Sequence, residues 1–136
     1  MIAIDTSVIL AIALREPEAD QFQRLVRREA LLIGWPTLLE LRMVLTGKGF
    51  LNAAAIVDHL SELPNVTAIA FDQAHYRAAE RAFDQFGKGR HPAGLNMGDC
   101  FSYAVASIAK ATILFKGHNF GKTDLKLHAE SAAAQP

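Results

Sequence analysis

Three acidic residues occupy positions at which a carboxylate could bind a cation. Asp5 directly follows the apolar run 2–4, Glu40 lies within the apolar stretch 37–45, and Asp99 begins the almost wholly apolar segment 97–109. A carboxylate in such surroundings is costly unless it is paired, capped or bound to a cation. The simpler roles are helix capping for Asp5 and Asp99, with Asn96 as a further cap residue, and a surface position for Glu40.

The elements that carry these acids alternate between short apolar runs and helical patterns. The runs 2–4, 31–34, 66–71 and 112–115 predict buried strands, and a short last strand is expected at 125–127. The stretches between them predict helices, among them 6–14, 37–45, 51–63 and 97–109. Strands that alternate with helices form parallel sheets with right-handed crossovers. We therefore expect an α/β/α sandwich around a central, mainly parallel sheet of four to five strands.

Length and composition predict one domain without extensive disorder. The chain has 136 residues, of which 51% are hydrophobic, and 14 basic residues balance 14 acidic ones. We expect the domain to span residues 1–128, followed by a frayed, small-residue-rich tail at 129–136. The lone Cys100 excludes an internal disulfide and is typical of core packing in a reducing compartment. We find no signal peptide or apolar run of membrane-spanning length, which predicts a soluble cytoplasmic protein without membrane association.

The three acids follow different strands, so a parallel sheet would bring them to one edge. Ligands bind beyond the carboxyl ends of the strands in open α/β sheets. Clustered carboxylates raise one another's pKa values unless a cation neutralises them. Their oxygens suit Mg²⁺ or Mn²⁺ rather than zinc, for which the scattered histidines provide no ligand set. Such a site fits phosphodiester hydrolysis, in which a metal ion activates water and stabilises the leaving oxygen.

Four features of the chain are found together: Glu40 in its helix and the segments 4–10 (IDTSVIL), 95–104 (LNMGDCFSYA) and 114–120 (LFKGHNF). Together they resemble the PIN-domain ribonucleases, in particular the VapC toxins of bacterial toxin–antitoxin pairs. The resemblance covers nearly the whole chain. It implies a single PIN-like domain and an endoribonuclease dependent on Mg²⁺ or Mn²⁺. Asp5, Glu40 and Asp99 would then be the catalytic acids, with Asp5 and Asp99 as metal ligands and the hydroxyl of Thr6 or Ser7 supporting the site.

The resemblance also implies partners. These are an RNA substrate, a cognate VapB-like antitoxin, and a second copy in a homodimer or a larger toxin–antitoxin assembly. The predicted helical hairpin at 36–63 would form part of the groove that grips the antitoxin's C-terminal segment. An antitoxin arginine inserted among the acids would inhibit the enzyme, because a guanidinium pairs bidentately with carboxylates.

The chain departs from the family pattern in the turn after the fourth strand. The family often carries a fourth acid there, whereas this turn reads Gly117-His118-Asn119. Asn119 can still offer a carbonyl oxygen or orient water, and Asp124 is a candidate for compensation from the next segment. A site with three acids should hold one metal ion more firmly than two.

Other residues have a functional and a simpler interpretation. Lys88, Arg90 and Lys116 could contact an RNA backbone, or they could simply face solvent. Trp35 is interpreted as a packing anchor, and Tyr76, Phe83 and Phe86 as core residues.

Two further functions remain open. One is a PIN fold that binds RNA or partners without cutting, which the missing fourth acid makes conceivable. The other is a receiver-like signalling domain, which would need Asp72 as its phosphoacceptor although that residue has the position of a helix cap.

Overall fold

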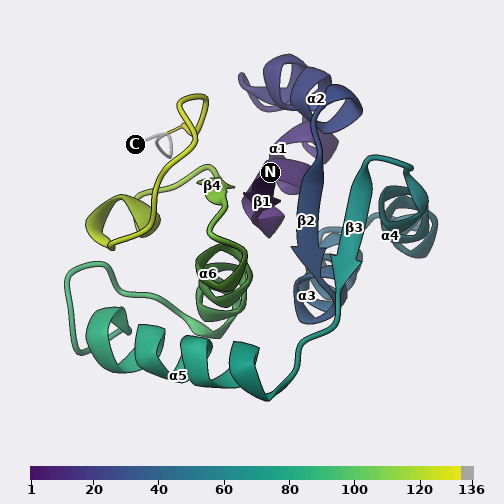
Figure 1. The fold of residues 1–136 in the computed structure, drawn as a ribbon. Helices are drawn as coiled ribbons and strands as arrows, with labels where there is room; N and C mark the ends of the chain where they lie inside the picture. Colours follow the sequence, from purple (N-terminus) through teal and green to yellow (C-terminus); the bar gives the residue numbers. More distant parts are fainter. Residues whose placement is uncertain (133–136) are drawn as a thin grey trace.

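The computed structural model describes residues 1–132, and residues 133–136 lie outside this description. Within it, helices alternate with short strands along most of the chain (Figure 1). The elements are β1 (Ile2–Ile4), α1 (Thr6–Ala13), α2 (Ala19–Arg28), β2 (Leu31–Gly34), α3 (Trp35–Gly47), α4 (Ala53–Glu62), β3 (Val66–Ile69), α5 (Gln73–Phe86), α6 (Met97–Ala109), β4 (Thr112–Leu114) and the short 3₁₀ helix η1 (Phe120–Lys122).

The four strands form one parallel sheet in the order β3-β2-β1-β4. Ile2 lies opposite both Leu31 and Thr112, and the N–H of Asp5 continues the ladder by donating to the Leu114 carbonyl at 3.1 Å. This confirms the predicted parallel sheet and places Asp5 at its carboxyl-end edge. The expected fifth strand at 125–127 is wrong, because Leu127 forms only an isolated bridge to Ile113.

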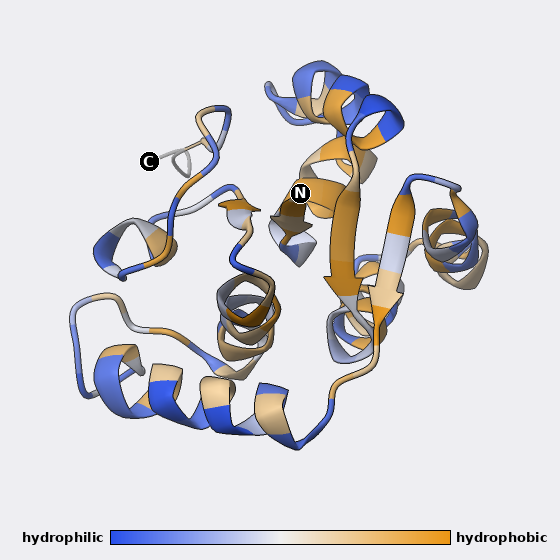
Figure 2. Ribbon diagram, viewed as in Figure 1, coloured by the Kyte–Doolittle hydropathy of each residue, from blue (hydrophilic) through white to orange (hydrophobic). Residues whose placement is uncertain are grey.

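Strand residues point alternately to two hydrophobic layers, as the period of a β-strand requires. Ile4 and Ile33 join the core formed with α1 to α4, whereas Ala3, Leu32 and Ile113 join the core formed with α5 and α6. Figure 2 shows the apolar sheet between helices whose outer faces are more polar. The predicted α/β/α sandwich is therefore confirmed. No helix among residues 1–132 is long and apolar enough to cross a membrane.

Side-chain caps define the starts of three helices. Asp5 caps α1 through the N–H of Ser7, and Asp72 forms a capping box with His75 at the start of α5. Asn96 and Asp99 form the predicted capping box of α6. The cap role confirms the structural interpretation of Asp72.

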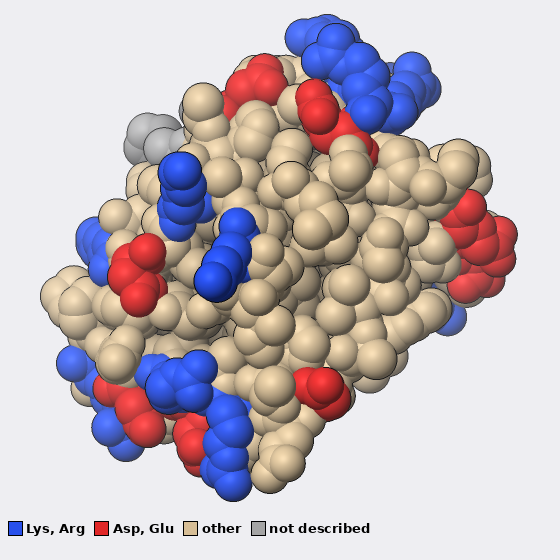
Figure 3. Space-filling model, in the orientation of Figure 1, with Lys and Arg blue, Asp and Glu red and all other residues tan. Residues whose placement is uncertain are grey.

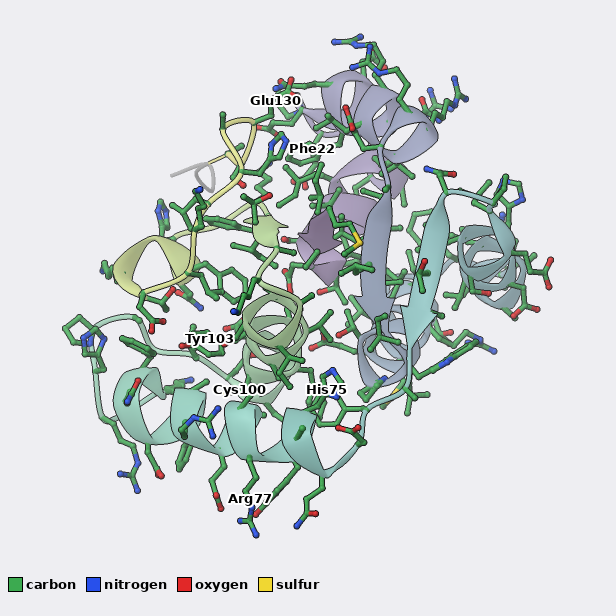
Figure 4. All side chains as sticks on the ribbon, viewed as in Figure 1. Phe22, His75, Arg77, Cys100, Tyr103 and Glu130 are labelled. Atoms are coloured by element: carbon green, nitrogen blue, oxygen red, sulfur yellow. The ribbon has the colours of Figure 1, made fainter. Side chains whose placement is uncertain are left out.

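The described part of the predicted tail is bound to the domain. Ala132 accepts a hydrogen bond from the Gly117 N–H at 2.8 Å and donates to the Phe115 carbonyl at 3.0 Å. Glu130 lies beside α2 and accepts a hydrogen bond from the Gln21 amide at 2.9 Å (Figure 4). Residues 129–132 are thus not frayed, while the rest of the predicted tail, 133–136, falls outside the described residues.

Aromatic residues expected in the core have mixed environments. Trp35, Tyr76 and Phe83 are each about half exposed, so the packing roles predicted for them are wrong. Their helical spacing does not reveal whether an apolar face meets the core or remains on the surface. Cys100 is buried, as predicted.

Candidate active site

Asp5 is a buried carboxylate held by hydroxyl groups from two elements. Its Oδ2 accepts bonds from the Ser7 hydroxyl at 2.7 Å and the Ser7 N–H at 3.1 Å. Its Oδ1 accepts from the Ser102 hydroxyl on α6 at 2.7 Å. Ser7 thus has the supporting position that the sequence predicted. Ser102 was not predicted from the sequence, although it lies three residues after Asp99 on the same face of α6.

Asp99 and Asn119 meet beside Asp5. The Asn119 amide donates to Oδ2 of Asp99 at 3.0 Å, and the Asn96 N–H donates to the same oxygen at 3.1 Å. Asp5, Asp99 and Asn119 all line a cavity of about 260 Å³. The structure therefore brings two predicted metal ligands and the predicted supporting amide to one site.

Glu40 reaches this region from α3. Its carboxylate packs against Gly98, where an added Cβ would lie 1.8 Å from Oε2. Only glycine leaves room for the acid at this point, and this close approach could not be predicted from the sequence. Burial, followed by repulsion from Asp5 and Asp99, raises the pKa of Glu40, and the hydroxyl of Thr6 acts in the opposite direction. Glu40 also lines a neighbouring, mainly apolar cavity of about 360 Å³.

The acids have no cationic partner in the described part of the chain. No lysine, arginine or histidine of residues 1–132 forms an ion pair with Asp5, Glu40 or Asp99. Burial is the main cause that raises the pKa of Asp99; Asp5 adds repulsion, while the bonds from Asn119 and Asn96 act against it. The site thus concentrates negative charge that its own residues do not neutralise, and carboxylate and amide oxygens suit Mg²⁺ or Mn²⁺.

The acids are close but are not arranged as a complete metal centre. Across residues 1–132, no group of three or more His, Cys, Asp or Glu side chains is placed to hold a metal ion. The hydrogen bonds to Asp5 and to Oδ2 of Asp99 give a physical reason, since they already use several carboxylate lone pairs. The donor set fits a divalent cation, and a cation bound by all three acids would require a side chain to turn.

The side chains of two predicted site residues have partners other than the three acids. The Lys116 side chain is only 7% exposed, and its Nζ lies 3.0 Å from Glu18 and 3.4 Å from Glu16. The ammonium group of Lys116 thus points into the protein, and its contact with RNA stays a prediction. Asp124 accepts a hydrogen bond from the Tyr103 hydroxyl instead of lining the acidic cavity, so its predicted compensating role is not supported. Figure 4 shows Tyr103 on α6.

Two groups of exposed basic residues stand out, and neither lines the cavity of Asp5 and Asp99. Lys88 and Arg90 are exposed in the loop after α5, and the Arg90 guanidinium stacks over Phe83 at 4.7 Å from the ring centre. Their role in RNA binding stays a prediction. Figure 3 shows further basic side chains gathered over α2, where the sequence places Arg24, Arg27 and Arg28. This group precedes β2, at the end of the sheet opposite the acids.

The fold and the acidic edge identify the class of protein. The family model described as PIN domain matches residues 2–126. The chain belongs to the PIN-domain family.

Sequence relatives narrow the class to the VapC type. Ribonuclease VapC30 of Mycobacterium tuberculosis is 36% identical over 123 residues, which cover 90% of this chain and 94% of that protein. Ribonuclease VapC of Mycolicibacterium smegmatis is also 36% identical over 123 residues, covering 90% and 95%. The chain is accordingly a VapC-type PIN protein, as the sequence motifs predicted.

Solved structures share the fold at low sequence identity. Mycobacterium tuberculosis VapC20, described as a toxin that cleaves the sarcin–ricin loop, matches with a TM-score of 0.76 and 16% identity over 92% of this chain and 96% of that one. VapBC2 from Rickettsia felis, bound to a promoter DNA fragment, matches with a TM-score of 0.70 and 16% identity over 94% and 98%.

Proposed function

We propose that this chain is an endoribonuclease dependent on Mg²⁺ or Mn²⁺ and the toxin of a type II toxin–antitoxin pair. The observation that carries the proposal is the group of uncompensated carboxylates at the carboxyl-end edge of the sheet, in a chain 36% identical to proteins named VapC ribonucleases. Such a site attracts a divalent cation and, with it, the phosphodiester group of RNA.

The roles of the residues follow from their contacts. Asp5 and Asp99 would hold the metal ion, because they share one cavity. Glu40, which lies on α3, would add a third negative charge beside them. A bound Mg²⁺ or Mn²⁺ supplies an activated water and stabilises charge on the phosphate oxygens. Ser7 and Asn119 orient the two carboxylates through their hydrogen bonds.

Cleavage of a mixed cellular RNA pool tests the proposal. We expect the purified protein to cut RNA at discrete positions with Mg²⁺ or Mn²⁺ and not with EDTA. Asp5→Asn and Asp99→Asn should each abolish the cuts while the fold survives. Asp58→Asn, an exposed position on α4, is the matched control and should cut like the wild type. Undiminished cleavage by both site variants would refute the assignment.

A second function, RNA or partner binding without cutting, is favoured by one feature of the site. Asn119 brings an amide rather than a fourth carboxylate to Asp99, and no complete metal group is preformed among residues 1–132. The same experiment separates the two functions. A folded protein that binds Mn²⁺ but cuts none of the pool supports the binding function.

We further propose that the antitoxin binds the apolar surface formed by Trp35, Leu39, Met43 and Met97. These residues are 54–74% exposed. Leu39, Met43 and Met97 line an apolar cavity that Glu40 also lines. A basic side chain from a bound apolar segment could reach the acids from there. Large exposed apolar side chains mark interaction surfaces. A second copy of the chain, in a homodimer, is the other partner that would fit this surface.

Co-purification with the cognate antitoxin tests the surface. We expect Leu39→Ser and Met43→Ser to weaken the complex by about tenfold or more, since buried apolar anchors dominate such interfaces. Leu51→Ser, fully exposed between α3 and α4, is the matched control. If all three variants bind alike, the antitoxin binds elsewhere. If the protein forms a dimer without its antitoxin and Leu39→Ser abolishes that dimer, the surface binds a second copy of the chain.

A further inference from the structure

Lys116 is a buried cation next to the acidic site that the proposed function leaves unused. Its Nζ lies 3.0 Å from Oε2 of Glu18 and 3.4 Å from Oε2 of Glu16. A buried ammonium group is tolerated only where opposite charge compensates it. These ion pairs therefore tie the turn after β4 to the connection between α1 and α2.

Both ends of this link are anchored. The N–H of Glu16 donates to the Ala11 carbonyl of α1 at 2.9 Å, and the Glu16 carbonyl accepts from Ala19 at the start of α2, also at 2.9 Å. On the other side, Gly117 is hydrogen-bonded to Ala132. The side chain of Lys116 thus joins two segments that are held independently.

The main chain of the same residue contacts the site. The Lys116 N–H donates to the Ser7 hydroxyl oxygen at 2.9 Å, and this hydroxyl donates its own proton to Oδ2 of Asp5 at 2.7 Å. A hydroxyl has one proton and two acceptor lone pairs. The bond from Lys116 therefore favours the rotamer in which Ser7 donates to Asp5.

We propose that Lys116 is a positioning residue for Asp5. Its ion pairs with Glu16 and Glu18 hold the turn after β4 so that the Lys116 N–H orients Ser7, and Ser7 fixes the Asp5 carboxylate for a divalent cation. This inference rests on the proposed metal-dependent function. It differs from the direct RNA contact predicted from the sequence, since the ammonium group is turned into the protein.

Mn²⁺ affinity, measured by the electron paramagnetic resonance signal of free Mn²⁺ without RNA, tests the link. Ser7→Ala should weaken binding about tenfold, the usual effect of removing a group that orients a ligand. Glu18→Gln removes charge without changing size, and should weaken binding about threefold or more. In the double variant that combines Ser7→Ala with Glu18→Gln, the second change should weaken Mn²⁺ binding by less than about a further twofold. The reason is that the hydroxyl through which Glu18 acts is already gone.

Matched variants separate positioning from folding. Glu80→Gln removes the exposed ion pair with Arg77 on α5 and should leave Mn²⁺ affinity unchanged. Lys116→Met should match Glu18→Gln; if it fails to fold, Glu16→Gln takes its place. A purely structural role would lower the melting temperature and leave Mn²⁺ affinity unaltered.

Two results would overturn the proposal. One is wild-type Mn²⁺ affinity in Glu18→Gln, and the other is full multiplication of the two effects in the double variant, which would mean that they act independently. Failure of the proposed function has a different signature. In that case Asp5→Asn and Asp99→Asn themselves would bind Mn²⁺ as the wild type does.

Discussion

Replacing Gly98 by alanine should separate the stability of the protein from its metal affinity. The added methyl carbon would lie 1.8 Å from Oε2, 2.5 Å from Cδ and 2.7 Å from Oε1 of Glu40. Carbon and oxygen atoms pack at about 3.5 Å, so the carboxylate must retreat by nearly 2 Å. The atoms that move are the end of a flexible side chain, and the backbone of α6 can stay in place.

The two expected effects have opposite signs. Alanine is about 0.5–1 kcal/mol more stable than glycine in a helix interior, and Gly98 lies in the first turn of α6, where the gain is smaller, so the metal-free variant should melt at or just above the wild-type temperature. Its Mn²⁺ affinity should fall about tenfold, since Glu40 no longer reaches the acids. Thermal melting without metal and titration calorimetry with Mn²⁺ measure the two quantities.

Gly47→Ala is the control, because an added Cβ at the end of α3 meets no atom within 4 Å. It should leave Mn²⁺ affinity unchanged. Unaltered affinity in Gly98→Ala would show that the position of Glu40 does not matter for the cation. An unfolded Gly98→Ala protein would refute the premise that only a side-chain end has to move.

Three further predictions follow from the site. Asn119→Asp should destabilise the metal-free protein and raise its thermal shift with Mg²⁺, because a second carboxylate replaces the amide beside Asp99; equal shifts in variant and wild type would contradict this. Burial raises the pKa of Asp99 above its ordinary value of 3.8, so folding takes up a proton there and stability falls as pH rises through the raised pKa. Urea unfolding from pH 4 to 7 should therefore show a weaker fall for Asp99→Asn than for the wild type. Burial raises the pKa of Cys100 from 9.0 to about 11, so iodoacetamide should modify the native thiol about 100-fold more slowly than the unfolded one at pH 8.

Local signals account for what the sequence predicted well. The apolar runs identified all four strands. β1 and β2 are buried throughout because both of their faces are covered, whereas β3, at the border of the sheet, leaves Thr67 exposed. The caps Asp72 and Asn96 were predicted because a short polar side chain directly before a helical pattern is typical of an N-cap. Parallel topology then brought Asp5 and Asp99 to one edge, where the structure places them in one cavity.

Contacts between distant segments account for what the sequence did not predict. The partners of Lys116 lie about a hundred positions earlier, and its charge alone gave no sign of them. The Ser102 hydroxyl and the missing Cβ of Gly98 gain their meaning only from α6 packing beside β1 and α3. Trp35 shows the same limit for surfaces, since the sequence does not distinguish an apolar residue at an exposed interaction surface from one in the core.

The hydrogen bonds between the C-terminal segment and β4 make the two borders of the sheet unequal. His128 and Ala132 donate to the carbonyls of Ile113 and Phe115, so the backbone groups on that side of β4 are occupied. On the other border, no strand among residues 1–132 pairs with the outer side of β3. Unpaired strand borders recruit strands from other chains. Any growth of the sheet by strand addition, whether in aggregation or in binding an extended peptide, is therefore directed to Val66–Ile69.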